Sequence, residues 1–175
     1  MSLKSIPKIH ADLLLAKELL YDSCGFECSL PEKEKESADY GAYSFQLNNK
    51  SIVFRAAKIT PTKIGLFVTL WKRIGNGPIQ PFDFTDAIDL IVISVRKENR
   101  VGQFIFPKSM LCEKGIISTT AKEGKRAIRV YPPWDEAINK QAQKTQQWQL
   151  DYFLEIPTEQ PVNIEHAKML YGLQN

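Results

Sequence analysis

Two segments in the middle of the chain, residues 88–96 and 103–108, carry apolar side chains on both faces that an extended strand presents. Strands of this kind are typical of the centre of a sheet that is covered on both sides. The polar residues Lys97 to Arg100 separate the two segments and predict the turn of a hairpin. We therefore expect the chain to fold around a buried sheet with these two strands at its centre.

Further strands are indicated on both sides of this pair. Residues 40–47 and 51–59 predict a β-hairpin around Asn48 and Asn49, because asparagine tolerates the positive φ of a tight turn. Two more strands are expected over 66–73 and 125–131. We predict a mixed central sheet that contains residues 51–59, 66–73, 88–96 and 103–108.

Helices are indicated at both ends of the chain. Apolar residues at helical spacing predict an amphipathic helix over 8–22, which Gly25 ends. A long helix is expected over 134–154, and a short one over 163–173 with Asn163 as its N-cap. The first two helices, 8–22 and 135–154, are expected to pack on the sheet.

These elements predict an α/β to α+β fold in one domain that spans residues 1–175. The polar run 31–36 is expected to be an exposed loop. No apolar run approaches the ~20 residues that cross a bilayer, and residues 1–8 lack the apolar stretch of a signal peptide. Three cysteines do not make a disulfide framework, so we expect a cytoplasmic protein.

Histidine and cysteine are too sparse and too scattered for a structural metal site. Neither of the glycine-rich phosphate-binding motifs occurs. The sequence therefore predicts no cofactor and no metal.

The basic residues are concentrated in the middle of the chain. Residues 51–81 hold five lysines and arginines and no acid, and residues 100–134 hold seven against two glutamates. Such a distribution favours one positive face that meets an anionic partner. The alternative is that these lysines lie at sheet edges, where they block aggregation.

Most of the basic residues fall near predicted strand ends, with aromatic residues interleaved. Basic groups contact phosphates and flat rings stack on unpaired bases, so we expect a nucleic-acid partner, single-stranded DNA or RNA more than duplex. A single tryptophan in such a place more often belongs to the core. The candidate binding residues are Arg55, Lys58, Lys63, Trp71, Lys72, Arg73, Lys108, Lys125, Arg126, Arg129, Tyr131 and Trp134, with Gln141 and Lys144 on one side of the long helix together with Trp148.

Three aspartates, Asp83, Asp86 and Asp89, precede or begin the first central strand, and Lys108 ends the second. Hairpins of this kind carry the metal site of many Mg²⁺-dependent nucleases, where carboxylates hold the ion and a lysine assists. The second carboxylate of that arrangement belongs two residues before the lysine, and Phe106 stands there. With Lys58 as the lysine, the same position is Ala56.

The hairpin therefore has the nuclease frame with Asp89 and Lys108 but lacks the second carboxylate that would hold the metal. The alternative is that Asp89 only caps one strand and Lys108 only ends the other. The remaining catalytic candidates are Asp89, Gln103 and Lys108. A site that has migrated to Asp86 or Asp89 together with Gln103 and Lys108 stays open as an alternative.

Four stretches resemble the signature of the MepB family: residues 54–73 (FRAAKITPTKIGLFVTLWKR), 102–108 (GQFIFPK), 124–135 (GKRAIRVYPPWD) and 139–142 (NKQA). The resemblance extends over roughly residues 40–155. It implies a fold similar to that of restriction-endonuclease-like nucleases of the PD-(D/E)XK class. It also implies binding of nucleic acid, single strands and RNA included, without the full catalytic set.

Three functions remain distinguishable. The first is a nucleic-acid-binding protein with a degenerate nuclease site. The second is an active Mg²⁺-dependent phosphodiesterase, which needs a second carboxylate close to Asp89. The third is a protein-interaction module that meets an acidic partner, which predicts a basic face without exposed aromatic side chains.

Overall fold

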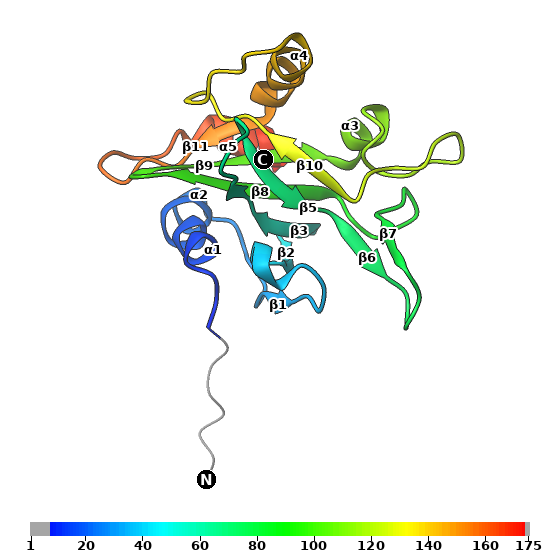
Figure 1. Ribbon diagram of the computed structural model, residues 1–175. Helices are drawn as coiled ribbons and strands as arrows, with labels where there is room; N and C mark the ends of the chain where they lie inside the picture. The colour runs from blue at the N-terminus through cyan, green and yellow to red at the C-terminus, as the bar shows by residue number, and fades with distance from the viewer. Residues whose placement is uncertain (1–7, 174–175) are drawn as a thin grey trace.

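The computed structural model describes residues 8–173 and has a mixed six-stranded sheet at its centre (Figure 1). The strands run in the order β1-β2-β3-β8-β9-β11, and only the β3–β8 pair is parallel. Their bounds are Glu32–Lys33 (β1), Tyr43–Leu47 (β2), Lys50–Ala56 (β3), Leu90–Lys97 (β8), Arg100–Pro107 (β9) and Phe153–Glu155 (β11). The expected mixed sheet is confirmed.

The two apolar segments form the central hairpin β8–β9, as predicted. Leu90 and Val92 face one side of the sheet, while Ile91 and Ile93 face the other, and all four are buried. Glu98 takes a positive φ of 55° in the turn between the strands. The hairpin of β2 and β3 is also confirmed, with Asn48 at a φ of 51° in its turn.

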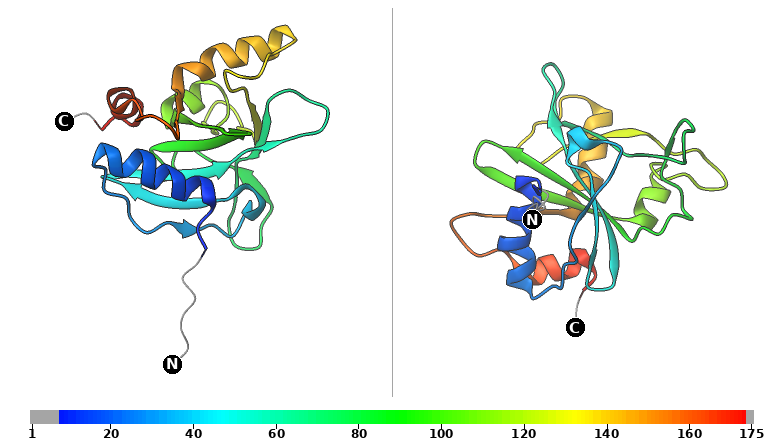
Figure 2. Two further views of the ribbon diagram at one scale, coloured as in Figure 1. Left: turned by 90° about the vertical axis from the view of Figure 1, so that its left-hand side faces the viewer. Right: turned by 90° about the horizontal axis from the view of Figure 1, so that it is seen from below.

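Helices cover one face of the central sheet. The N-terminal helix consists of α1 (Ala11–Ala16), a π-helical turn (Lys17–Tyr21) and α2 (Asp22–Cys24), and it ends at Gly25 with a φ of 72°. It lies beside α5 (Ile164–Tyr171), whose N-cap is Asn163 (Figure 2). Both predicted helices are confirmed, apart from small shifts of their ends.

The other face is covered by a second, three-stranded sheet and by α3 and α4. The order of this sheet is β10-β5-β4, with β10 at Ala127–Val130, β5 at Leu66–Thr69 and β4 at Lys58–Ile59. Its inward side chains pack on those of β8 and β9. Helix α3 spans Lys108–Glu113 and α4 spans Lys140–Gln149.

The placement of residues 66–73 in the central sheet was wrong. They form two strands in two different sheets: β5 pairs with β10 and β4, and β6 (Trp71–Arg73) pairs with β7 (Ile79–Pro81). Leu66 and Val68 are buried because β5 lies across the central sheet rather than beside it. The segment 51–59 also divides, since β3 ends at Ala56 and β4 belongs to the second sheet.

The single long helix expected over 134–154 was also wrong. Helix α4 begins only after Asn139, whose side chain accepts a hydrogen bond from the backbone N–H of Ala142 at 2.8 Å. After a 3₁₀ turn the chain becomes β11, which adds an edge strand to β9. Gly102 permits this pairing, because a Cβ there would lie 2.4 Å from the ring of Phe153.

The polar run 31–36 is anchored on the domain rather than free. Glu32 and Lys33 form β1, and Glu34 Oε2 lies 2.7 Å from Arg55 Nη2. Glu36 binds Arg73 at 2.8 Å and accepts a hydrogen bond from the indole of Trp71 at 3.1 Å. The partners lie far away in the sequence, so local composition could not reveal them.

Within residues 8–173, no helix combines the length and the apolar character needed to cross a membrane.

Candidate functional site

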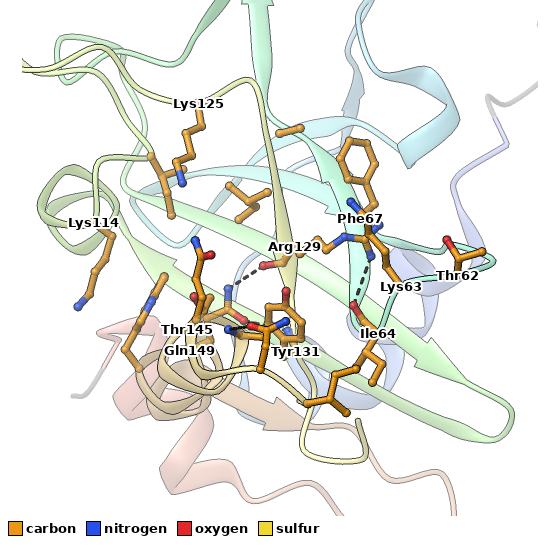
Figure 3. A pocket seen from close by; sticks show the side chains of 18 residues that line it. Thr62, Lys63, Ile64, Phe67, Lys114, Lys125, Arg129, Tyr131, Thr145 and Gln149 are labelled. Atoms are coloured by element: carbon orange, nitrogen blue, oxygen red, sulfur yellow. Dashed lines mark hydrogen bonds between the residues drawn. The ribbon is translucent and has the colours of Figure 1, made fainter. Parts of the chain in front are cut away.

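A cleft of about 670 Å³ lies between the second sheet and α4 (Figure 3). Its walls are formed by residues from β5, β10, α4, the loop before β5 and the segment that follows α3. The lining residues used below are Lys63, Phe67, Lys114, Lys125, Arg129, Tyr131, Gln141, Trp148 and Gln149. The volume lies within the range of ordinary ligand sites.

All the charged residues that line the cleft are basic. Lys63, Lys114, Lys125 and Arg129 line it, and none of its lining residues is an aspartate or a glutamate. Figure 3 shows Lys114 and Lys125 toward one end and Lys63 toward the other, with Arg129 and Tyr131 between them. A concave surface with charges of one sign concentrates ions of the opposite sign, so this cleft attracts anions.

Arg129 also organises the wall of the cleft. Its Nη2 donates to Thr60 Oγ1 at 2.8 Å, and its Nη1 lies 3.4 Å from the carbonyl oxygens of Ile64 and Gly65. The guanidinium is 5.8 Å from the centre of the Phe67 ring. Arg129 thereby holds the loop that carries Lys63 against the second sheet.

Gln149 joins the two walls. Its side chain is 1% exposed, donates to the carbonyl of Arg129 and accepts from the N–H of Tyr131, each at 2.9 Å. Gln146 adds bonds from the same helix to the carbonyls of Pro132 and Asp135, at 2.9 and 2.8 Å. These glutamines fix the position of α4 relative to β10, a role that the sequence did not indicate.

The predicted polar side of the long helix is only partly in the cleft. Gln141 and Trp148 line it, whereas Lys144 is exposed outside it. Trp148 packs on Phe106 with ring centres 5.3 Å apart, and Lys114 Nζ lies 5.4 Å from its ring. Lys114 was not among the predicted site residues, because the short helix α3, which ends just before it, was not foreseen.

Of the residues predicted for one binding face, the cleft brings together Lys63, Lys125, Arg129, Tyr131 and Gln141. Several others are engaged by acidic side chains elsewhere. The ion pairs are Lys72–Asp86 at 2.8 Å, Arg73–Glu36 at 2.8 Å and Arg126–Glu123 at 3.0 Å. Hydrogen bonds from Arg73 and from Trp71 lower the pKa of Glu36.

The remaining predicted residues lie in other surroundings. Lys58 Nζ is 4.8 Å from the centre of the Tyr40 ring. Trp134 is half-buried, with the Arg100 guanidinium 4.8 Å from its ring, and it lines a neighbouring cleft.

Arg55 is 0% exposed, so its place on a binding surface is corrected. Its guanidinium donates to the carbonyl oxygens of Thr69 and Phe54, at 3.2 and 3.0 Å, and pairs with Glu34. Burial lowers the pKa of Arg55, and Glu34 opposes that shift.

Asp89 and Lys108 lie together at one end of the central hairpin. The backbone N–H of Lys108 donates to the carbonyl of Asp89 at 3.1 Å, and the Lys108 ammonium donates to the carbonyl of Asp86. The carboxylate of Asp89 accepts from the N–H of Ser51 at 2.8 Å. Phe106, at the position of the missing carboxylate, is fully buried.

Gln103 is not part of this group. It pairs with Ser94 in the register of β8 and β9, whereas Pro107, next to Lys108, pairs with Leu90. Its side chain accepts a hydrogen bond from the hydroxyl of Tyr171 in the opposite layer of the core. The geometry therefore does not support the alternative catalytic site in which Gln103 joins Asp86 or Asp89 and Lys108.

The other two aspartates, Asp83 and Asp86, accept hydrogen bonds within the loop that precedes β8. Asp86 accepts from the N–H of Asp83 at 2.7 Å, and two hydrogen bonds from Thr85 lower the pKa of Asp83. Across residues 8–173, no three His, Cys, Asp or Glu side chains are grouped so that they could hold a metal ion.

Comparison with known proteins adds to this geometry. The family model MepB-like matches residues 34–155, which include every residue that lines the cleft. The chain belongs to the MepB-like family. The chain is also similar to a solved protein described as the crystal structure of MepB, with 37% identity and a TM-score of 0.73. The match covers 86% of this chain and 99% of that one. No match was found among curated proteins.

Proposed function

We propose that this MepB-like protein binds nucleic acid, single strands in preference to duplex, in the cleft between the second sheet and α4. The observation that carries the proposal is the cleft itself, in which Lys63, Lys114, Lys125 and Arg129 surround aromatic side chains without any acid. The rings favour unpaired bases, on which they can stack, over a partner that is recognised by its acidic charge alone.

The two kinds of side chain match the two parts of a nucleotide. Each phosphate of a single strand that is neutralised steepens the slope of log K against log salt by about 0.7. Stacking of an unpaired base on an aromatic ring contributes about 1–3 kcal/mol. The cleft offers Phe67, Tyr131 and Trp148 for such contacts. A closed duplex hides the faces of its bases, so only its phosphates can be used.

We further propose that the fold is that of a PD-(D/E)XK nuclease whose active site has degenerated. Asp89 and Lys108 support this, because Asp89 immediately precedes β8 and Lys108 immediately follows β9, at the same end of the central hairpin. The side chain two residues before Lys108 is Phe106, which packs against Trp148 in the core and has no oxygen for a metal. Mg²⁺ is commonly held by carboxylates and substrate phosphates, so Asp89 alone is insufficient.

The test is the anisotropy of a fluorescent single strand titrated with protein, compared with the same strand in a duplex. Lys63→Ala, Lys114→Ala and Lys125→Ala are each expected to weaken single-strand binding by about three- to tenfold. Lys144→Ala is the matched control, because it removes the same charge from an exposed position outside the cleft. Equal loss in all four variants would contradict binding in the cleft. Tighter binding of the duplex would contradict the strand preference.

A further inference from the structure

A second cleft of about 400 Å³ continues the first. The two share Lys63, Ile64 and Ile138 as lining residues, so they form neighbouring parts of one groove. A strand that occupies the first cleft can therefore extend into the second past Lys63. The position of Lys63 suits a phosphate that links two nucleotides.

The second cleft differs from the first in its chemistry. Ile59 and Ile138 are 66% and 76% exposed, and with Trp134 they give the cleft large apolar surfaces. Asp135 and Glu136 line it together with Arg96, which is paired with Asp12, and Lys97. The two carboxylates disfavour a phosphate beside them, so the phosphates of a strand are expected to lie toward Lys63 and Lys97.

Asp135 is held in place with its carboxylate unengaged. Its N–H donates to the carbonyl of Pro132 at 3.0 Å, and its own carbonyl accepts from Gln146 at 2.8 Å. Within residues 8–173, neither a hydrogen bond nor an ion pair engages its carboxylate. Burial raises its pKa, and Lys97 opposes that shift. A carboxylate at the wall of a cleft with no protein donor beside it can accept a hydrogen bond from a ligand.

Nucleic-acid bases provide such a donor. The flat face of an unpaired base matches the apolar surface of Ile59 and Ile138, while aspartate and glutamate accept hydrogen bonds from the 4-amino group of cytosine. The 4-oxo group of uracil or thymine would instead bring an acceptor against the carboxylate.

We propose that the second cleft holds the unpaired base of the nucleotide next to the one in the first cleft, and that Asp135 selects an amino-bearing base. This inference rests on the proposed function, because it places a second nucleotide of the same strand. Lys63 contacts the phosphate between the two nucleotides. Phosphate affinity and base preference thus belong to two adjoining parts of the groove.

The test compares deoxycytidine and deoxyuridine homopolymers of about ten nucleotides, a length within the range that small single-strand binders cover. Both bases are pyrimidines of one size, and they differ at the 4-amino or 4-oxo position and in the proton on N3. Binding is measured by anisotropy at neutral pH for the unmodified protein, Asp135→Asn and Glu136→Gln. The unmodified protein is expected to bind the cytidine strand about fivefold more tightly, the equivalent of one hydrogen bond.

Asp135→Asn is expected to reduce the preference to less than about twofold, because an amide can either donate or accept. Glu136 is an exposed residue of the same cleft, and Glu136→Gln is expected to keep most of the preference for the cytidine strand. Equal binding of both strands by the unmodified protein would overturn the inference and leave the proposed function standing. If Asp135→Asn keeps the preference for the cytidine strand, the inference would also be overturned and the proposed function would stand. Failure to bind either strand would overturn both.

Discussion

The side chain of Gln149 on α4 bridges the backbone of β10, where it donates to Arg129 and accepts from Tyr131, each at 2.9 Å. One buried amide thereby fixes the distance between the two walls of the basic cleft. It also satisfies two backbone groups at the edge of the second sheet.

Gln149→Ala would leave these backbone groups without partners. A buried polar group that loses its hydrogen bond costs about 1–3 kcal/mol, so we expect the free energy of unfolding to fall by about 2–4 kcal/mol. Urea denaturation followed by circular dichroism measures the loss. Gln147→Ala is the control, since Gln147 is exposed on the same helix and should change stability by less than about 0.5 kcal/mol. Equal effects of the two substitutions would refute this role of Gln149.

The buried Arg55 depends on Glu34 for its counter-charge. Glu34→Gln would leave a guanidinium in the core without an anion, and removal of one partner from a buried pair costs about 3–5 kcal/mol. We expect a loss of about 2–4 kcal/mol here, because Glu34 itself remains 22% exposed. Glu36→Gln, which breaks the more exposed pair with Arg73, is expected to cost less in the same denaturation experiment. A larger loss from Glu36→Gln would contradict this account.

Asp135 should make stability depend on pH. Burial raises its pKa in the folded protein above the value in the unfolded chain. Between those two pKa values the folded protein binds more protons than the unfolded chain, so stability falls as pH rises through this window. Asp135→Asn is therefore expected to raise the Tm at pH 7 and to leave it unchanged below about pH 3, where both states are protonated. Thermal unfolding at the two pH values measures this, and a lower Tm at pH 7 would show that the carboxylate stabilises the fold.

Asp89→Ala tests the degenerate nuclease site. We expect the affinity for a single strand to change by less than about twofold, because Asp89 lies outside the basic cleft. Stability should fall by about 1 kcal/mol with the loss of the hydrogen bond from Ser51. A nicking assay with Mg²⁺ should detect no cleavage by the unmodified protein or by Asp89→Ala. Robust nicking that depends on both Mg²⁺ and Asp89 would establish a phosphodiesterase instead.

The parts of the fold that followed from local patterns were predictable. Residues 88–96 were predicted as a buried strand because both of their faces are apolar, and β8 covers most of this segment. Asn48 and Asn163 mark a turn and a helix start through their own backbone and side-chain preferences. Residues 66–73 were recognised as a strand, but a local pattern does not say which sheet a strand joins.

The candidate site was harder to predict, because charge pairing is a long-range property. Arg73 and Glu36 are 37 residues apart, and nothing near either of them reveals the pair. Lys114 was missed because helix α3, which ends just before it, was not foreseen, and Gln149 resembled any other residue of a polar helix. Lys63, Lys125 and Arg129 were foreseen as basic residues near turns, but only the second sheet brings them to one cleft.

The salt dependence of binding tests the central claim most directly. The measurement is the slope of log K against log salt for a fluorescent single strand between about 50 and 200 mM salt. It compares the unmodified protein, the triple variant Lys63→Ala/Lys114→Ala/Lys125→Ala, and a control variant Lys33→Ala/Lys35→Ala/Lys144→Ala with the same loss of charge at exposed positions. If the three cleft lysines each neutralise one phosphate, the first variant flattens the slope by about 2 and the control leaves it nearly unchanged. Equal slopes in all three proteins would contradict nucleic-acid binding in this cleft.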